Sequence, residues 1–273
     1  MVEAVRRTRG NPLNALLVLA TAAVVFFAIY ARQSANEFLY QAPPSPNYDR
    51  GGDFRFVRGS DGSEINVFWE RGSESTRTVL YCCGTSEDLA RAMPLLRSHQ
   101  LKGFNVASFE YRSFGYTKVE PSQKSLYADS LAVFDFIVSE MVGRESNLVV
   151  HGHSLGGAIA LEIATRRESG AVILESSFSS AYSVLMRMDW IPGDLYRNKA
   201  KAGNVVCPVL LIHGEADSVV PLSDAVDLAN SFDQDRIERH YVPNGGHFDL
   251  RNVAGVGYWP SIEPFIWNLD SSG

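Results

Sequence analysis

Residues 151–157 read His-Gly-His-Ser-Leu-Gly-Gly. They begin at the last residue of the stretch 147–151, which is typical of a buried strand. The spacing of Gly152, Ser154 and Gly156 is that of a nucleophile elbow, in which a strand turns into a helix so sharply that glycines must flank the serine. The free N–H groups of the following helix point to the same place. This spacing is common by itself. Its position between a strand and a helix predicts that Ser154 is a nucleophile rather than a serine that only caps the helix.

The same alternation of apolar strand and amphipathic helix extends along most of the chain. Expected strands are 54–57, 65–69, 78–83, 105–111, 147–151, 171–175, 209–213 and 237–242. Expected helices are 87–100, 122–142, 155–166, 222–232 and 259–269. This order predicts an α/β fold with a mostly parallel, eight-stranded sheet and helices on both faces. In such a sheet ligands bind beyond the carboxyl ends of the strands.

Two further strand ends carry residues that would complete the chemistry of Ser154. Asp217 lies in the loop after strand 209–213, and His247 follows strand 237–242. A histidine can take the serine proton near neutral pH and return it later, and a carboxylate fixes the tautomer of the imidazole. The chain order Ser154, Asp217, His247 therefore predicts a catalytic triad. Glu175, at another strand end, is the first alternative for the acid.

The neighbouring residues receive other expected roles. His153 adjoins Ser154 at a turn where adjacent side chains point apart, so we expect it to be structural, and Asp249 to be a partner within the loop of His247. Acyl transfer needs two donors for the developing oxyanion. We expect these to be the backbone N–H groups of Leu155, directly after the nucleophile, and of Thr85, in the loop after the third strand.

Composition excludes several classes of function. The chain has 273 residues, a net charge of −6 and 45% hydrophobic residues, which are ordinary values for a globular domain. There is no large basic cluster after residue 60, so a nucleic-acid partner is not expected. The sequence also lacks Cys-x-x-Cys and His-Glu-x-x-His motifs, and we expect neither a metal nor a cofactor.

The N-terminal part predicts a membrane anchor. Residues 13–31 are apolar almost throughout and long enough to cross a bilayer, whereas 1–12 form a basic tail with Arg6, Arg7 and Arg9. The excess of positive charge before the span predicts a cytoplasmic N-terminus, with the catalytic domain on the far side. A cleaved signal peptide and a buried core helix are the alternatives. Residues 32–50, with Pro43, Pro44 and Pro46, are then typical of an extended tether to a domain over 51–270.

The segment 179–204 is the largest insertion between two expected strands. It is rich in aromatic residues and methionine, and it predicts a small cap over an acyl pocket, with Met186 and Trp190 as substrate-contacting residues. The alternative is a plain helix packed on the core.

These motifs together resemble the α/β-hydrolase superfamily, and in detail its membrane-anchored α/β-hydrolase-domain branch. The segments that carry the resemblance are 81–89, 111–116, the helix start at 121–122, the elbow, 213–221 and 245–250. The branch usually has His-Gly-Asn in the first loop, and this chain has Cys83-Gly84-Thr85. The change keeps a backbone donor at Thr85 but puts the hydrogen bonding that holds the loop in doubt.

The resemblance implies a serine hydrolase similar to monoacylglycerol lipases and acyl-protein thioesterases. The expected substrate is therefore an acyl or lipid-like ester or thioester beside a membrane. Two other functions stay open, a peptidase of the proline-aminopeptidase type on the same triad and a non-catalytic scaffold with a hydrolase fold.

Overall fold

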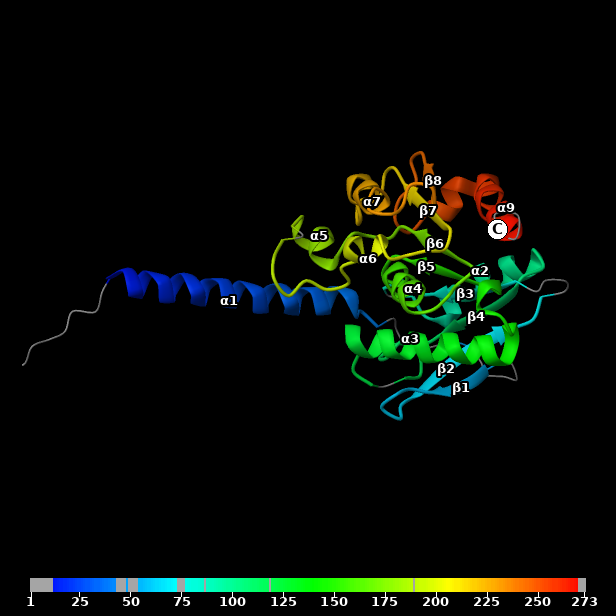
Figure 1. Ribbon diagram of the computed structural model, residues 1–273, viewed down its shortest axis with the longest axis horizontal. Helices are drawn as coiled ribbons and strands as arrows, with labels where there is room; N and C mark the ends of the chain where they lie inside the picture. Colours follow the sequence, from blue (N-terminus) through cyan, green and yellow to red (C-terminus); the bar gives the residue numbers. More distant parts are fainter. Residues whose placement is uncertain are drawn as a thin grey trace, which may run out of the picture.

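A computed structural model of the chain describes residues 12–42, 48, 54–72, 77–85, 87–117, 119–188 and 190–269. One long helix, α1 (Pro12–Leu39), leads into a rounded α/β domain (Figure 1). Residues 1–11 of the expected tail 1–12 and the proline-rich stretch 43–47 lie outside the described residues, and Pro12 begins α1.

The domain is built on one eight-stranded sheet, as the sequence predicts, with the order β1-β2-β4-β3-β5-β6-β7-β8. The strands are β1 (Phe54–Arg58), β2 (Glu64–Glu70), β3 (Thr78–Cys82), β4 (Asn105–Phe109), β5 (Leu148–His153), β6 (Ala171–Glu175), β7 (Val209–Gly214) and β8 (Ile237–Val242). Strand β2 pairs antiparallel with β1 and β4, and all the other neighbours are parallel. The antiparallel start is a hairpin that turns around residues 59–63. The parallel part brings the ends of β3, β5, β6, β7 and β8 to one edge of the sheet.

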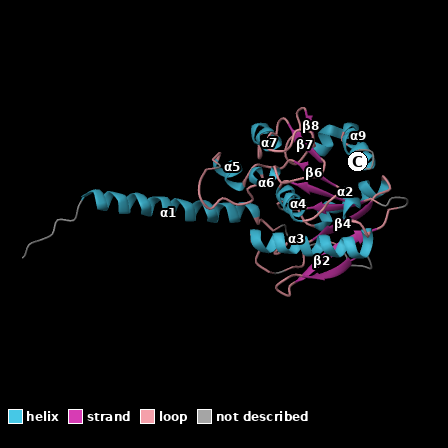
Figure 2. Cartoon of the chain, in the orientation of Figure 1, coloured by secondary structure: helices cyan, strands magenta, loops and turns pink. Residues whose placement is uncertain are grey.

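Helices cover both faces of this sheet (Figure 2). They are α2 (Leu89–Leu101), α3 (Gln123–Ile137), α4 (Leu155–Arg166), α7 (Leu222–Ala229), α8 (Leu250–Ala254) and α9 (Trp259–Trp267). Helix α4 packs on β3, β5 and β6, and α3 packs on α4. Strands β3, β4 and β6 are buried along their whole length, which explains their continuous apolar sequences. The helix expected over 122–142 ends as an α-helix at Ile137 and continues as one π-helical turn, Val138–Val142.

Helix α1 is longer than the sequence pattern predicts. The residues from Leu13 to Leu39 form a helix that is long and apolar enough to cross a membrane. The expectation of a tether that begins at residue 32 is wrong, because the helix continues to Leu39. The reason is a stripe of side chains four residues apart, Ala31, Ala35 and Leu39, which are buried against the domain. Packing of these side chains stabilises the helix beyond residue 31, where hydropathy alone no longer predicts a helix.

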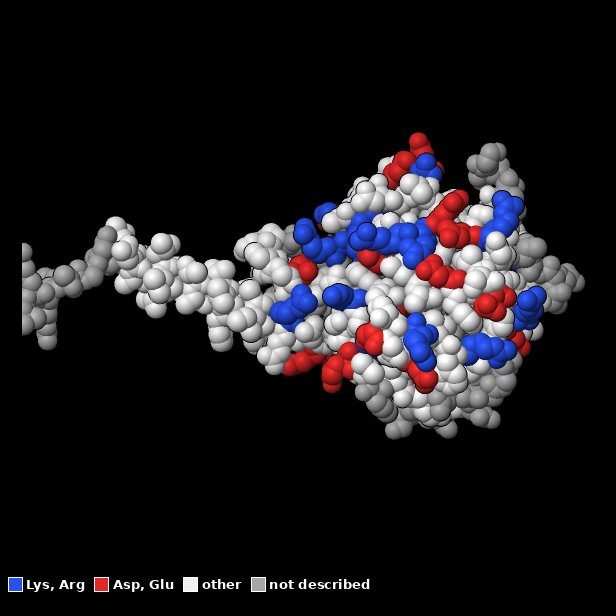
Figure 3. Space-filling view, turned by 60° about the horizontal axis from the view of Figure 1, so that its bottom comes forward, with Lys and Arg blue, Asp and Glu red and all other residues white. Residues whose placement is uncertain are grey.

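The cap expected over 179–204 contains two short helices, α5 (Ala181–Met186) and α6 (Lys199–Ala202). Helix α5 contacts α1, and the loop between α5 and α6 runs beside α1 (Figure 1). Tyr182, Leu195 and Tyr196 are fully buried, so this segment is packed on the core. On the face seen in Figure 3, charged side chains of both signs are distributed over the domain, whereas the projecting part of α1 carries none.

Candidate active site

Ser154 occupies a strained turn between β5 and α4. Its backbone has φ 52° and ψ −114°, values that a residue with a side chain rarely adopts. A Cβ at Gly152 would lie 2.2 Å from the carbonyl oxygen of Gly156, and one at Gly156 would lie 1.9 Å from the carbonyl oxygen of Cys82. Only glycine fits at either position. The Gly-x-Ser-x-Gly spacing is therefore required by the close approach of three backbone segments around Ser154.

The structure brings the three predicted triad residues together from three strand ends. Nε2 of His247 lies 3.1 Å from Oγ of Ser154, and Nδ1 of His247 lies 2.8 Å from Oδ2 of Asp217. All three residues are buried, with 6–8% of their surface exposed. This is the geometry in which an imidazole can accept the serine proton while a carboxylate orients the ring.

Asp217 is held by more than the histidine. Its Oδ1 accepts hydrogen bonds from the backbone N–H groups of Val219 and Val220 at 2.9 and 2.8 Å. Burial acts to raise the pKa of Asp217, but the hydrogen bonds from His247 and Val220 outweigh it and lower the pKa. The carboxylate is therefore ionised at neutral pH and fixed in one orientation.

The two backbone N–H groups expected as oxyanion donors belong to Thr85, in the loop after β3, and to Leu155, directly after Ser154. Among the described residues, the N–H groups of Thr85 and Leu155 make no hydrogen bond. Leu155 is the first residue of α4, where backbone N–H groups have no partner within the helix. Both positions are those expected from the sequence, and their joint action on an oxyanion is part of the function proposed below.

The loop that carries Thr85 is held by a residue that the sequence motifs do not single out. Oε2 of Glu87 accepts a hydrogen bond from the backbone N–H of Gly84 at 2.7 Å, and both carboxylate oxygens accept from the hydroxyl of Tyr81. Glu87 also lies 3.3 Å from Nδ1 of His153. These contacts supply the loop hydrogen bonding that the departure from His-Gly-Asn puts in doubt. The available signal was Glu87 itself, an acidic residue three positions after Gly84.

His153, which we expected to be structural, lies beside the site and lines the cavity next to His247. Its Nε2 lies 3.4 Å from the backbone oxygen of His247, and the two rings are 5.5 Å apart. Burial acts to lower the pKa of His153, but the carboxylate of Glu87 outweighs it and raises the pKa. Burial acts to raise the pKa of Glu87. The hydrogen bond with His153 is the largest of the contacts that outweigh burial and lower this pKa to about 2. The two side chains therefore form a half-buried ion pair at pH values between the pKa of Glu87 and that of His153.

Glu175, the alternative acid, is occupied elsewhere. Its Oε1 accepts from Nε of Arg251 at 2.7 Å, and its Oε2 lies 3.2 Å from Nε2 of His151 and accepts from the Tyr258 hydroxyl at 2.6 Å. Within the described part of the chain, it is Asp217 and not Glu175 that contacts the ring of His247.

Asp249 has the role that the sequence predicts. It accepts a hydrogen bond from the backbone N–H of Gly246 at 2.7 Å, so it is a partner within the loop that carries His247.

A cavity of about 320 Å³ lies beside His247. Its lining residues are mostly polar or charged: Thr85, Glu87, Arg91, His153, Glu175, His247, Phe248, Leu250 and Arg251. Met186 and Trp190, expected to contact substrate, do not line it. Met186 is half-buried at the end of α5, and Trp190 is 77% exposed.

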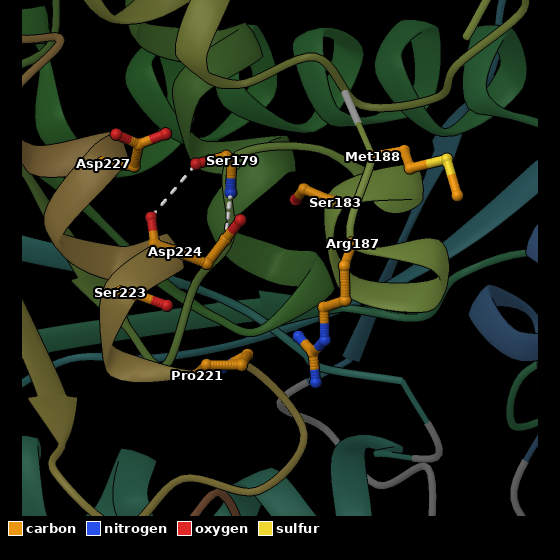
Figure 4. A pocket seen from close by; sticks show the side chains of 8 residues that line it. All are labelled: Ser179, Ser183, Arg187, Met188, Pro221, Ser223, Asp224 and Asp227. Atoms are coloured by element: carbon orange, nitrogen blue, oxygen red, sulfur yellow. Dashed lines mark hydrogen bonds between the residues drawn. The ribbon is translucent and has the colours of Figure 1, made fainter. Parts of the chain in front are cut away.

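A second cavity, about 370 Å³, lies between the cap and α7 (Figure 4). Ser179 connects its two sides, because its backbone N–H donates to Oδ2 of Asp224 at 2.7 Å and its hydroxyl donates to the Asp224 carbonyl at 3.1 Å. Ser183, Arg187 and Met188 line the side of the cap. Across the residues that the structure describes, no group of three or more His, Cys, Asp or Glu side chains is arranged to hold a metal ion.

Comparison with known proteins shows which families the chain is similar to. The model of the family described as "Serine aminopeptidase, S33" matches residues 73–198. An alpha/beta hydrolase domain-containing protein of Caenorhabditis elegans is 30% identical over 69% of this chain, and the match spans 57% of the nematode protein's length. Human alpha/beta hydrolase domain-containing protein 17B is 29% identical over 71% of this chain and 68% of its own. An uncharacterized protein of Mycobacterium tuberculosis is 27% identical over 96% of both chains.

Solved structures show the same fold at low sequence identity. An esterase of Pyrococcus furiosus superposes with a TM-score of 0.70 at 15% identity, covering 83% of this chain and 98% of the esterase. A monoacylglycerol lipase of Paleococcus ferrophilus superposes with a TM-score of 0.58 at 17% identity, covering 74% of this chain and 99% of the lipase. The chain thus has the α/β-hydrolase fold. It belongs to the α/β-hydrolase superfamily and resembles the alpha/beta hydrolase domain-containing serine hydrolases.

Proposed function

We propose that the protein is a serine hydrolase that cleaves a carboxylic ester or thioester through Ser154, His247 and Asp217. The observation that carries the proposal is the continuous chain of contacts from Oγ of Ser154 to His247, 3.1 Å, and from His247 to Asp217, 2.8 Å. A non-catalytic scaffold would not need this alignment at a strained elbow.

The proposed reaction has two halves. Oγ of Ser154 attacks the acyl carbon while Nε2 of His247 takes its proton, and the same proton then passes to the departing alcohol or thiol. Water hydrolyses the acyl-enzyme in the second half, with His247 again as the base. The N–H groups of Thr85 and Leu155 stabilise the oxyanion in both halves. Asp217 stabilises the imidazolium that forms each time.

We propose an acyl or lipid-like substrate. Esterases and a monoacylglycerol lipase are among the structural neighbours, and α1 would hold the domain beside a membrane. The cavity beside His247, whose lining includes polar, charged and apolar residues, suits the departing group of such a substrate. Met186 and Trp190 remain proposed contacts for the acyl part; Met186→Ala and Trp190→Ala test them by changing the preference among p-nitrophenyl esters of different chain length.

We also propose that α1 is an uncleaved anchor with its N-terminus in the cytoplasm. The support is its length, its lack of charge from residue 13 to residue 31 and the three arginines that precede it. Full-length protein should resist extraction by carbonate and high salt. Protease added to intact cells or vesicles reports on which side the domain lies, and a mature N-terminus near residue 35 would show a cleaved signal instead.

A peptidase of the proline-aminopeptidase type is a second candidate because the matching family model is described as a serine aminopeptidase. Such an enzyme needs a free carboxylate for the substrate amine. The two carboxylates at the cavity, Glu87 and Glu175, are already engaged with His153 and Arg251. Cleavage of an ester or thioester is therefore favoured.

Pre-steady-state kinetics tests the proposal. A slowly deacylating p-nitrophenyl ester should release a burst of nitrophenol equal to the concentration of active enzyme before the steady state. Rapid turnover of aminoacyl amides without ester hydrolysis would favour the peptidase, and no turnover of either would favour the scaffold.

A further inference from the structure

The end of α1 reaches the loop that carries the proposed oxyanion donor. The hydroxyl of Thr85 donates a hydrogen bond to the carbonyl oxygen of Leu39, the last residue of α1, at 3.3 Å. The last carbonyl groups of a helix have no partner within it, so a hydroxyl from elsewhere can satisfy one. The side chain of Leu39 is 1% exposed, and this contact is therefore part of a packed interface.

The cap holds the same turn of α1 from another side. The hydroxyl groups of Tyr40 and Tyr196 are 2.8 Å apart, and Tyr196 is fully buried. The backbone N–H of Tyr40 donates to the carbonyl of Asn36 at 3.0 Å, so the helical hydrogen bonding runs through to the residue that contacts the cap. Ala31 and Ala35 are buried earlier on the same face. The end of α1 is thus fixed to the domain at several points.

The loop between Cys83 and Glu87 is consequently held on two sides. Glu87 fixes Gly84 from the sheet side through its backbone N–H, and Leu39 fixes Thr85 from the helix side through its hydroxyl. The N–H of Thr85 itself stays free of hydrogen bonds to described residues. Because this N–H and the bonded hydroxyl belong to one residue, fixing the hydroxyl restricts the direction of the N–H.

We infer that the last turn of α1 is a positioning element of the active site: the carbonyl of Leu39 holds Thr85 so that its backbone N–H points to the oxyanion. This inference rests on the proposed function and extends it. The helix that is apolar enough to span a membrane then also orients a group of the active site. Thr85 has two roles in this account, a backbone donor to substrate and a side-chain link to α1.

The test removes the link and leaves the donor. In full-length protein in detergent micelles, Thr85→Val keeps the shape of the side chain and the backbone N–H but loses the hydroxyl. Losing an oxyanion donor outright lowers kcat by roughly 10²–10³, so a misdirected donor should lower it by about 5–30-fold. KM for a p-nitrophenyl ester should change by less than about twofold, because the donor acts mainly in the transition state. Thr85→Ser, which restores a hydroxyl, should recover most of the lost kcat.

Thr21 supplies a matched control on the same helix. Its hydroxyl donates to the carbonyl of Leu17 at 2.9 Å, in the apolar part of α1 far from the site. Thr21→Val therefore removes the same kind of bond without touching the loop, and it should leave kcat unchanged. Thermal unfolding and the titre of active serine should be the same for both valine variants and for the wild type.

Three results would overturn the inference. They are full kcat in Thr85→Val, an equal loss in Thr21→Val, or a loss that follows the fraction of folded enzyme rather than kcat per active serine. Failure of the proposed function gives a different picture, since the wild type itself would then show neither a titratable serine nor ester hydrolysis.

Discussion

Arg251 donates a hydrogen bond from Nε to Oε1 of Glu175 at 2.7 Å. Burial acts to raise the pKa of Glu175, but coulombic attraction from Arg251 helps to lower it, so the pair is ionised. Glu175 ends a strand that neighbours both β5 and β7, and by sequence it could have oriented His247. In the structure the Glu175 carboxylate instead contacts Arg251, His151 and Tyr258, and it is Asp217 that contacts His247.

This difference predicts that two isosteric substitutions, Asp217→Asn and Glu175→Gln, affect different properties of the protein. Asp217→Asn should lower kcat by roughly 10²–10⁴ with little change in KM, because the imidazole loses its orienting carboxylate. Glu175→Gln should leave kcat per active serine nearly unchanged but lower the melting temperature, because Arg251 loses its charged partner. Steady-state kinetics with active-site titration and thermal unfolding measure both. A large loss of kcat in Glu175→Gln with an active Asp217→Asn would reverse the assignment of the acid.

The elbow predicts a strict requirement for glycine. In Gly156→Ala the new Cβ would lie 1.9 Å from the carbonyl oxygen of Cys82. The backbone at Cys82 cannot move away without a large cost in the free energy of folding. We expect a loss of at least about 3 kcal/mol in the free energy of unfolding, or no folded protein.

Gly257→Ala is the control for the elbow. Nothing among the described residues lies within 4 Å of the point that its added methyl group would occupy, so this change should alter stability by less than about 0.5 kcal/mol. Urea unfolding followed by tryptophan fluorescence compares the two variants. A stable, active Gly156→Ala would contradict this account of the elbow.

Glu87 predicts a pH-dependent contribution to stability. The folded state lowers the pKa of Glu87 to about 2, below its unfolded value of about 4.3, so its stabilising effect is full above about pH 4.3 and is lost as pH falls toward 2. Glu87→Gln should therefore be less stable than the wild type at neutral pH, and the difference should shrink as pH falls from about 4.5. Urea unfolding at a series of pH values measures it. A difference that stays constant down to about pH 2.5 would show that Glu87 is not ionised in the fold.

The local signals of the sequence predicted most of the sheet and the residues that meet at its edge. An elbow such as Gly152-x-Ser154-x-Gly156 is a short pattern, and Asp217 and His247 each follow a strong apolar strand. Because parallel strands end at the same edge, these separate signals were enough to expect the three side chains together. The three side chains are in contact in the structure, and their catalytic role is a proposal.

The contacts that were missed have no local pattern. Tyr81 and Arg251 are 170 residues apart, yet the guanidinium donates to the tyrosine hydroxyl at 2.8 Å. Such pairs depend on the packing of α8 against the sheet, which spacing in the sequence does not reveal. The continuation of α1 did leave a trace, since Ala31, Ala35 and Leu39 recur every four residues. A hydropathy profile does not reveal this spacing, because polar residues such as Arg32 and Glu37 interrupt the apolar run.

The most direct test of the account is the mass and position of a trapped covalent adduct. Full-length protein is treated with a fluorophosphonate, digested and mapped by mass spectrometry, with Ser154→Ala and His247→Ala treated in parallel. We expect one phosphonyl group on Ser154 in the wild type and none in Ser154→Ala, whose ester hydrolysis should fall by about 10⁴-fold or more. His247→Ala should react far more slowly, because the serine has lost its base. An adduct on any other residue, or full hydrolysis by Ser154→Ala, would contradict the assignment of Ser154 as the nucleophile.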